Sequence, residues 1–90
     1  MATLSIDVGG TASSVTVHIA GQPVPTTNGK GSIDNISSGN TLVQWWLSGN
    51  PQSTMTLSVK CAGTEIGNFN DAIPPAPETK GFGFDWIMVP

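Results

Sequence analysis

The stretch Leu42–Leu47, which reads LVQWWL, decides the fold class because its apolar side chains follow a period of two. Successive residues of a β-strand point to opposite faces of a sheet, whereas an amphipathic helix repeats its apolar positions every three or four residues. The two adjacent tryptophans therefore cannot enter the same core. Trp45 shares its phase with Val43 and is expected to be a core ring, and Trp46 is expected on the opposite face.

The same alternation recurs along most of the chain, and no segment has the apolar spacing of an amphipathic helix. The core positions expected from it are Leu4, Ile6, Val15, Val17, Val43, Trp45, Leu57, Val59, Phe84 and Trp86. Two weaker and shorter strands are expected around Ile33–Ile36 and Thr64–Phe69. The chain is therefore predicted to consist of β-strands throughout.

Turn residues separate these strands at the spacing of a β-sandwich. Asn28-Gly29 fits a type I′ turn, in which both central residues need a positive φ. Further breaks are marked by Gly9-Gly10, Gly39-Asn40, Gly49–Pro51 and Ala62-Gly63. The proline-rich stretch Asn70–Lys80 is too long for a hairpin and is expected to cross from one sheet to the other.

These features predict a single domain over residues 1–90. The expected fold is all-β, a small immunoglobulin-like antiparallel β-sandwich of about seven strands. A small β-barrel is the alternative. Immunoglobulin-like describes only the architecture, because the Cys…Trp…Cys spacing of true immunoglobulin domains is absent. A chain of 90 residues can bury one thin core without metals or disulfides.

Charge excludes several classes of partner. The net charge is -3, with three lysines and no arginine, so the cationic surface that nucleic acids require cannot form. Anionic membranes attract such a chain poorly, and no run approaches the roughly 20 apolar residues needed for membrane insertion as a helix. The first residues lack the basic and apolar regions of a signal peptide. Localisation stays unknown: the chain is either cytosolic or a domain whose export signal lies elsewhere.

Cys61 is the only cysteine, which excludes a disulfide scaffold within the chain and any zinc site that needs two cysteines. Its strand phase predicts a buried, reduced and slowly reacting thiol. Oxygen-rich runs at Asp34-Asn35 and Asn68–Asp71 contain calcium-ligand types, but without the spacing of an EF-hand loop. We therefore expect neither a metal nor another cofactor.

The run Ile6–Thr11, IDVGGT, resembles the first phosphate loop of sugar kinases and actin-like ATPases, in which a strand ends in Asp-x-Gly-Gly-Thr. The resemblance implies phosphate binding by backbone N–H groups and a metal-bound water held by Asp7. It covers six residues, and the family's second phosphate loop and adenosine site have no counterpart here. The run is therefore interpreted as a hairpin turn.

Trp46 and its neighbours are the candidate binding residues. An aromatic ring exposed beside an aliphatic side chain, as expected for Trp46 beside Leu42, marks a contact or packing site. The outward-facing candidates are Trp46, Gln44, Leu42, His18 and Lys60. No nucleophile, base and metal ligands converge in the sequence, so we expect no enzymatic activity and no catalytic residue.

We expect a non-catalytic recognition or assembly module that acts through protein–protein contact, with another copy of itself as a homo-oligomer or with a different protein. A surface this poor in charge lacks the repulsion that keeps monomers apart, and strand edges with few lysines favour edge-to-edge pairing. The alternative is a small carbohydrate-binding module in which Trp46 stacks on a sugar ring beside Gln44. In a third interpretation the loop Pro74–Pro77 covers Trp46, which then only packs.

Overall fold

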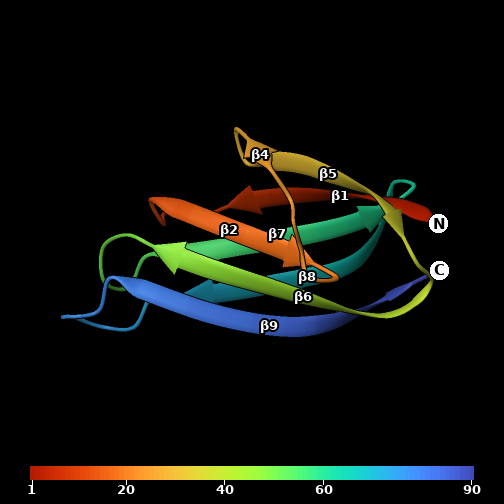
Figure 1. Cartoon of the computed structure of the whole chain (residues 1–90). Coiled ribbons are helices and arrows are strands. Elements are labelled where there is room, and N and C mark those ends of the chain that lie inside the picture. The colour runs from red at the N-terminus through yellow and green to blue at the C-terminus, as the bar shows by residue number, and fades with distance from the viewer.

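The computed structural model describes all 90 residues, which form two β-sheets packed face to face (Figure 1). One sheet has the strand order β4-β5-β1-β7-β8 and the other β3-β2-β6-β9, with every pairing antiparallel. The strands are β1 Ala2–Gly9, β2 Ser14–Ile19, β3 Gln22–Pro23, β4 Thr26–Thr27, β5 Lys30–Ile36, β6 Gly39–Ser48, β7 Thr54–Cys61, β8 Thr64–Ala72 and β9 Lys80–Val89. The structure contains no helix, and so no helical segment that could span a membrane.

The predicted β-sandwich is confirmed. Seven strands have six residues or more, and only β3 and β4 are limited to two. The strand order nevertheless differs from that of an immunoglobulin constant domain, in which the first two strands share a sheet. Here β1 and β2 lie in different sheets. The architecture is therefore a sandwich with its own connectivity.

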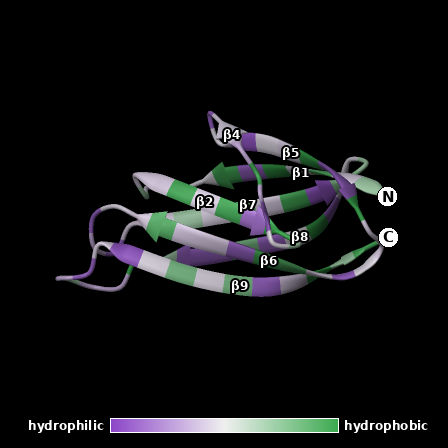
Figure 2. Ribbon diagram, in the orientation of Figure 1, coloured by the Kyte–Doolittle hydropathy of each residue, from purple (hydrophilic) through white to green (hydrophobic).

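The core lies between the sheets and contains fifteen buried apolar side chains. These are Leu4, Ile6, Val17, Ile19, Val24, Ile36, Val43, Trp45, Leu47, Met55, Leu57, Val59, Ile73, Ile87 and Val89. Seven of the ten predicted core positions are among them, and Val15 is half-buried against the same cluster. Figure 2 shows the underlying alternation as bands of contrasting hydropathy along strands such as β2 and β9. Strand phase therefore identified most of the core.

The phase predicted for β9 is wrong. Phe84 and Trp86 were expected in the core but are 59% and 58% exposed, whereas Ile87 and Val89 of the same strand are buried. Residues of the opposite phase thus point inward, and every large aromatic side chain of β9 points outward.

Trp45 explains this reversal. Its indole ring stacks on Phe69 with a centroid distance of 5.2 Å, and its Nε1 donates a hydrogen bond to Asp71 Oδ2 at 2.8 Å. The ring fills the space beneath β9, so a Cβ atom on Gly83 would collide with it. Only a glycine fits at that inward position, and the neighbouring aromatic residues are left on the outer face.

Two-residue turns with positive φ at both positions close three hairpins. Asn28-Gly29, with φ of 53° and 78°, joins β4 to β5 and confirms the predicted turn. Ala62-Gly63 joins β7 to β8 with φ of 51° and 83°, and Ala20-Gly21 joins β2 to β3 in the same way. Local sequence therefore sets strand pairing at these three places.

The longer connections cross between the sheets. Gly9-Gly10 leads from β1 in one sheet toward β2 in the other, so its interpretation as a hairpin turn is wrong. Residues 73–79 lead from β8 to β9 and also change sheet, as predicted for the proline-rich stretch. Gly39-Asn40 begins β6 instead of separating two strands.

Candidate binding face

Large apolar side chains gather on the outer face of the four-stranded sheet. They form the aromatic face, which consists of Trp46 on β6 and of Phe82, Phe84, Trp86 and Met88 on β9. Antiparallel pairing of β6 and β9 places Trp46 opposite Phe82. The same register places Gln44 opposite Phe84 and Leu42 opposite Trp86. One continuous surface therefore runs along two neighbouring strands.

The rings of the aromatic face contact one another but are not coplanar. The centroids of Trp46 and Phe82 are 5.3 Å apart and their planes are inclined by 46°. Phe82 and Phe84 are 6.3 Å apart with an inclination of 36°. His18 on β2 extends the row, with its ring edge-on to Trp46 at 4.7 Å. The surface is therefore corrugated across three strands.

The exposed area of this face is large for so small a protein. Its five side chains are between 38% and 59% exposed. With about 200 Å² for each large side chain, they expose roughly 500–600 Å² together. The largest apolar patch of a typical monomer covers about 300–600 Å² and is often functional. The aromatic face lies at the upper end of that range.

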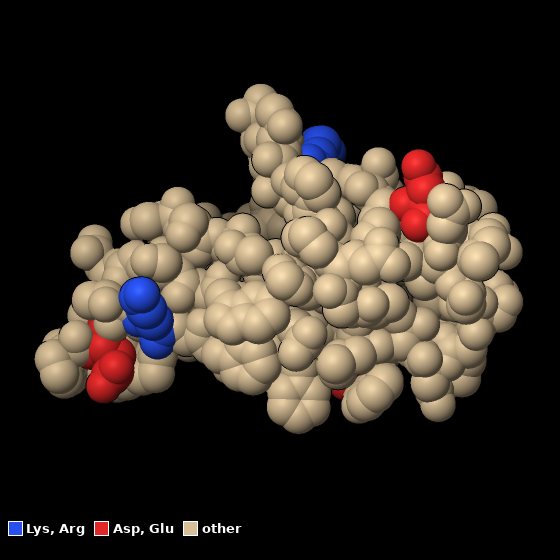
Figure 3. Space-filling view, in the orientation of Figure 1, with Lys and Arg blue, Asp and Glu red and all other residues tan.

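No charged side chain interrupts the aromatic face. Lys80 lies at the start of β9, one row away from Phe82 and opposite Ser48, and Asp85 belongs to the inward phase of the strand. Figure 3 looks onto the four-stranded sheet and shows charged atoms near the margins but none over the middle. A contact on this face would therefore bury apolar surface without removing ions from water.

Four of the five predicted candidates lie together at this site. Trp46, Gln44, Leu42 and His18 all belong to the outer face of β2 and β6. Lys60 does not, because it lies on β7 in the opposite sheet. Strand phase gives the direction of a side chain relative to the core, but it does not say to which sheet the strand belongs.

Sequence reasoning missed the β9 half of the site. Phe82, Phe84, Trp86 and Met88 share one phase, and their size suggested a core strand. The signal that could have corrected this is the run Lys80–Phe84, KGFGF, in which glycine alternates with phenylalanine. Glycines facing a core leave room for a large ring from another strand, and Trp45 supplies that ring.

The outer face of the five-stranded sheet has a contrasting, polar character. Lys30 Nζ forms an ion pair with Asp7 at 3.2 Å, and Ser58 donates a hydrogen bond to Glu65 at 2.7 Å. These polar groups are partnered with one another and are exposed to solvent. The molecule therefore has one polar face and one apolar face.

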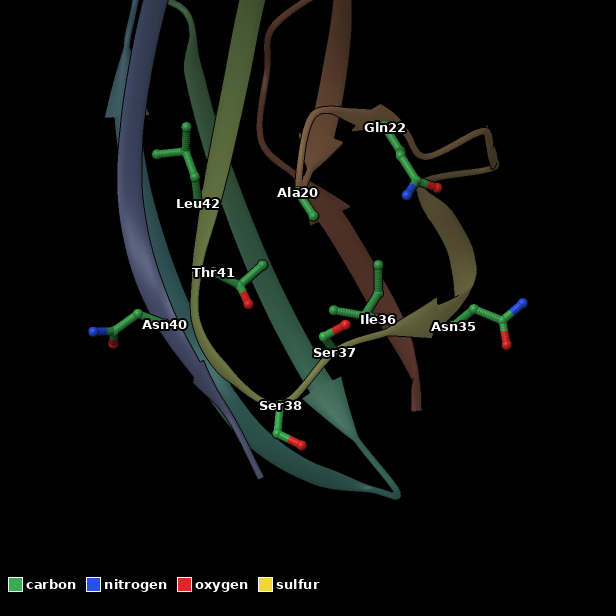
Figure 4. A pocket seen from close by; sticks show the side chains of 9 residues that line it. All are labelled: Ala20, Gln22, Asn35, Ile36, Ser37, Ser38, Asn40, Thr41 and Leu42. Carbon is green, nitrogen blue, oxygen red and sulfur yellow. The ribbon is translucent and has the colours of Figure 1, made fainter.

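A hollow of about 270 Å³ lies at one end of the sandwich. Figure 4 shows Ile36, Ser37 and Thr41 around it, whereas Asn35 and Asn40 point away. Its volume falls just below the roughly 300–1,000 Å³ of small-molecule sites. It contains neither an aromatic ring nor a charged group, so it lacks the features that hold most small ligands.

The end of the run that resembles a phosphate loop is hydrogen-bonded within the protein. The backbone N–H groups of Thr11 and Ala12 both donate to the carbonyl oxygen of Thr54, at 2.9 and 3.0 Å. The run therefore fastens the crossing between the sheets to β7.

No three His, Cys, Asp or Glu side chains gather in a way that could hold a metal. Cys61 is half-buried, where full burial was expected.

Neither a protein-family model, nor a curated protein, nor a solved structure matches this chain. The aromatic face is consequently the main guide to its function.

Proposed function

We propose that the protein is a non-catalytic assembly module that pairs with a second copy of itself through the aromatic face. The observation that carries this proposal is a contiguous, uncharged and exposed apolar surface of roughly 500–600 Å². A stable interface of standard size buries about 800 Å² per partner. The aromatic face, together with the bordering side chains of Leu42, Gln44 and His18, supplies an area of that order.

A second copy suits this surface for electrostatic and steric reasons. In a two-fold contact the same patch meets itself, and a patch without charged groups does so without repulsion. Inclined rings leave ridges and gaps that can interdigitate, as side chains do between two sheets packed about 10 Å apart. Such a dimer would repeat, between molecules, the packing that already holds the two sheets together.

The energy scale also favours association. Removing roughly 500 Å² of apolar surface from water on each copy contributes about 25 kcal/mol at about 25 cal/mol per Å². Association costs about 4–15 kcal/mol in lost translation and rotation, and ordering of side chains adds to that cost. The hydrophobic contribution exceeds the cost of association, so the free-energy balance favours a dimer; the buried area alone does not set its affinity.

Light-scattering mass measured during gel filtration tests the proposal. Wild type is expected at about twice 9.3 kDa. Phe84→Glu, which places a charge in the middle of the face, is expected at the monomer mass with an unchanged circular dichroism spectrum. Ser32→Glu adds the same charge on the outer face of β5 and should remain dimeric. A monomeric wild type, or a dimeric Phe84→Glu variant, would refute the proposal.

Sugar binding through Trp46 is less well supported by the geometry. The rings beside it are inclined by 46° and 36°, where a flat sugar chain needs nearly coplanar rings. No aromatic residue lines the end pocket, so stacking and hydrogen-bonding groups do not converge there. A monomeric wild type whose tryptophan fluorescence changes with one sugar of a panel would reverse this preference.

A further inference from the structure

The free edge of β9 carries unpaired backbone groups whose direction follows from the register. Leu42 and Trp86 lie opposite each other, and the carbonyl oxygen of Leu42 accepts a hydrogen bond from Ala20 on the other side of β6. Antiparallel pairs alternate between bonded and non-bonded positions, so Leu42 and Trp86 form a non-bonded pair. The N–H and C=O groups of Trp86 therefore point away from the sheet, as do those of Phe84 and Met88.

The sequence of this edge favours pairing with another strand. Segment Phe82–Val89 is rich in aromatic and β-branched residues, contains no proline, and has Asp85 as its only charged side chain. Exposed edges with these properties template the addition of further strands. The long β9 edge therefore needs a feature that prevents open-ended growth of the sheet.

Asp85 lies in the middle of this edge and occupies one of its free donors. Its Oδ1 accepts a hydrogen bond from the backbone N–H of Trp86 at 2.7 Å. Asp85 is exposed to solvent, although the phase of β9 directs its side chain toward the core side. A strand added to β9 would have to displace this hydrogen bond and remove the carboxylate from water, which costs free energy.

We propose that Asp85 is a gatekeeper, a residue that keeps the free edge of β9 from pairing with another β-strand. This role is independent of the proposed dimer, because it concerns the edge of the sheet and not its face. Edge-to-edge pairing, expected from the scarcity of lysines, is opposed at β9 by a carboxylate.

The free edge of β8, in the five-stranded sheet, also has an aspartate that accepts a hydrogen bond from an edge N–H group. Thr54 lies opposite Ala72 and its carbonyl oxygen accepts hydrogen bonds from the other side of β7, so the N–H of Ala72 faces the free edge of β8. Asp71 Oδ1 accepts that N–H at 2.8 Å. Asp71 also holds the Trp45 indole, so a variant there would disturb the core. Asp85 makes no second side-chain hydrogen bond and is the cleaner site for a test.

The experiment compares Asp85→Val with wild type and with Glu78→Gln, which removes the same charge from the loop before β9. Light scattering and thioflavin T fluorescence are followed at neutral pH over a concentration series. Asp85→Val is expected to form large β-rich particles, with scattering at least tenfold above both controls. An Asp85→Val variant with the same mass and fluorescence as Glu78→Gln would overturn the inference.

A proline at Met88 separates edge pairing from simple misfolding. The Met88 N–H points to the free edge, so proline there removes a donor for an added strand and leaves the β6–β9 hydrogen bonds intact. Asp85→Val/Met88→Pro is expected to lose the large β-rich particles and to match the mass of Met88→Pro alone, which is the reference here because Met88 also belongs to the aromatic face. If the double variant aggregates as strongly as Asp85→Val, growth does not use the β9 edge and the inference is wrong. A monomeric wild type combined with this rescue would refute only the proposed dimer.

Discussion

Gly83→Ala tests the packing that turns the aromatic residues of β9 outward. A Cβ atom at position 83 would lie 2.6 Å from Trp45 Cε2 and 2.8 Å from Asp71 Oδ2. Neither group can move freely, because the Trp45 ring is buried and its Nε1 donates to the same Asp71 oxygen. Overpacking of this kind costs about 1–3 kcal/mol, and weakening a hydrogen bond to a carboxylate adds about 1 kcal/mol or more.

The free energy of unfolding of Gly83→Ala is therefore expected to fall by about 2–4 kcal/mol, which lowers the Tm of a domain this small by roughly 10–25 °C. Gly81→Ala is the matched control on the same strand. Its Cβ would meet Leu47 Cδ1 at 3.4 Å, an ordinary contact, so stability should stay the same or rise by up to about 1 kcal/mol. Urea and thermal denaturation measure both variants. Equal stabilities for Gly83→Ala and Gly81→Ala would show that Trp45 does not set the phase of β9.

Three further outcomes are expected from the structure. Trp45→Ala should lose about 3–5 kcal/mol of stability in urea denaturation, because it empties the core, and Trp46→Ala only about 1–2 kcal/mol, since its ring lies on the outer face. Cys61 is half-buried against the core, so a thiol reagent should label the folded protein several-fold more slowly than the urea-unfolded chain. Asn28→Val should destabilise the fold by about 1–2 kcal/mol, because a β-branched residue resists the φ of 53°; a Tm equal to that of wild type would contradict this.

The phase of β6 could be predicted from sequence because two tryptophans stand side by side and one matches Val43 and Leu47. The phase of β9 could not be predicted in the same way, since both of its phases contain apolar residues. The choice depends on Trp45, which lies in the neighbouring strand β6 and occupies the volume on the core side of Gly83. Local periodicity does not contain that information.

Local sequence patterns also could not predict which of the two sheets each strand joins. Lys60 was expected beside Trp46 because both alternate out of phase with core residues. Pairing of β7 with β1 and β8 places Lys60 on the opposite side of the sandwich. The two-residue turns, in contrast, could be predicted from the local sequence. Asn28-Gly29 reverses the chain because both residues readily adopt a positive φ.

The stability of a single copy does not account for the aromatic residues of β9. The core closes without them, since Ile87 and Val89 fill the inward positions near the end of the strand and Gly83 admits the Trp45 ring. Threonines in place of Phe84 and Trp86 would preserve the strand propensity and leave the core contacts unchanged. Large exposed rings lower solubility, and within a single copy the pairs Trp46–Phe82 and Phe82–Phe84 return only about 0.2–1 kcal/mol each. Their position on one uncharged face is the arrangement that the proposed dimer requires, and the proposed gatekeeper role of Asp85 would direct association to that face and away from the edge of β9.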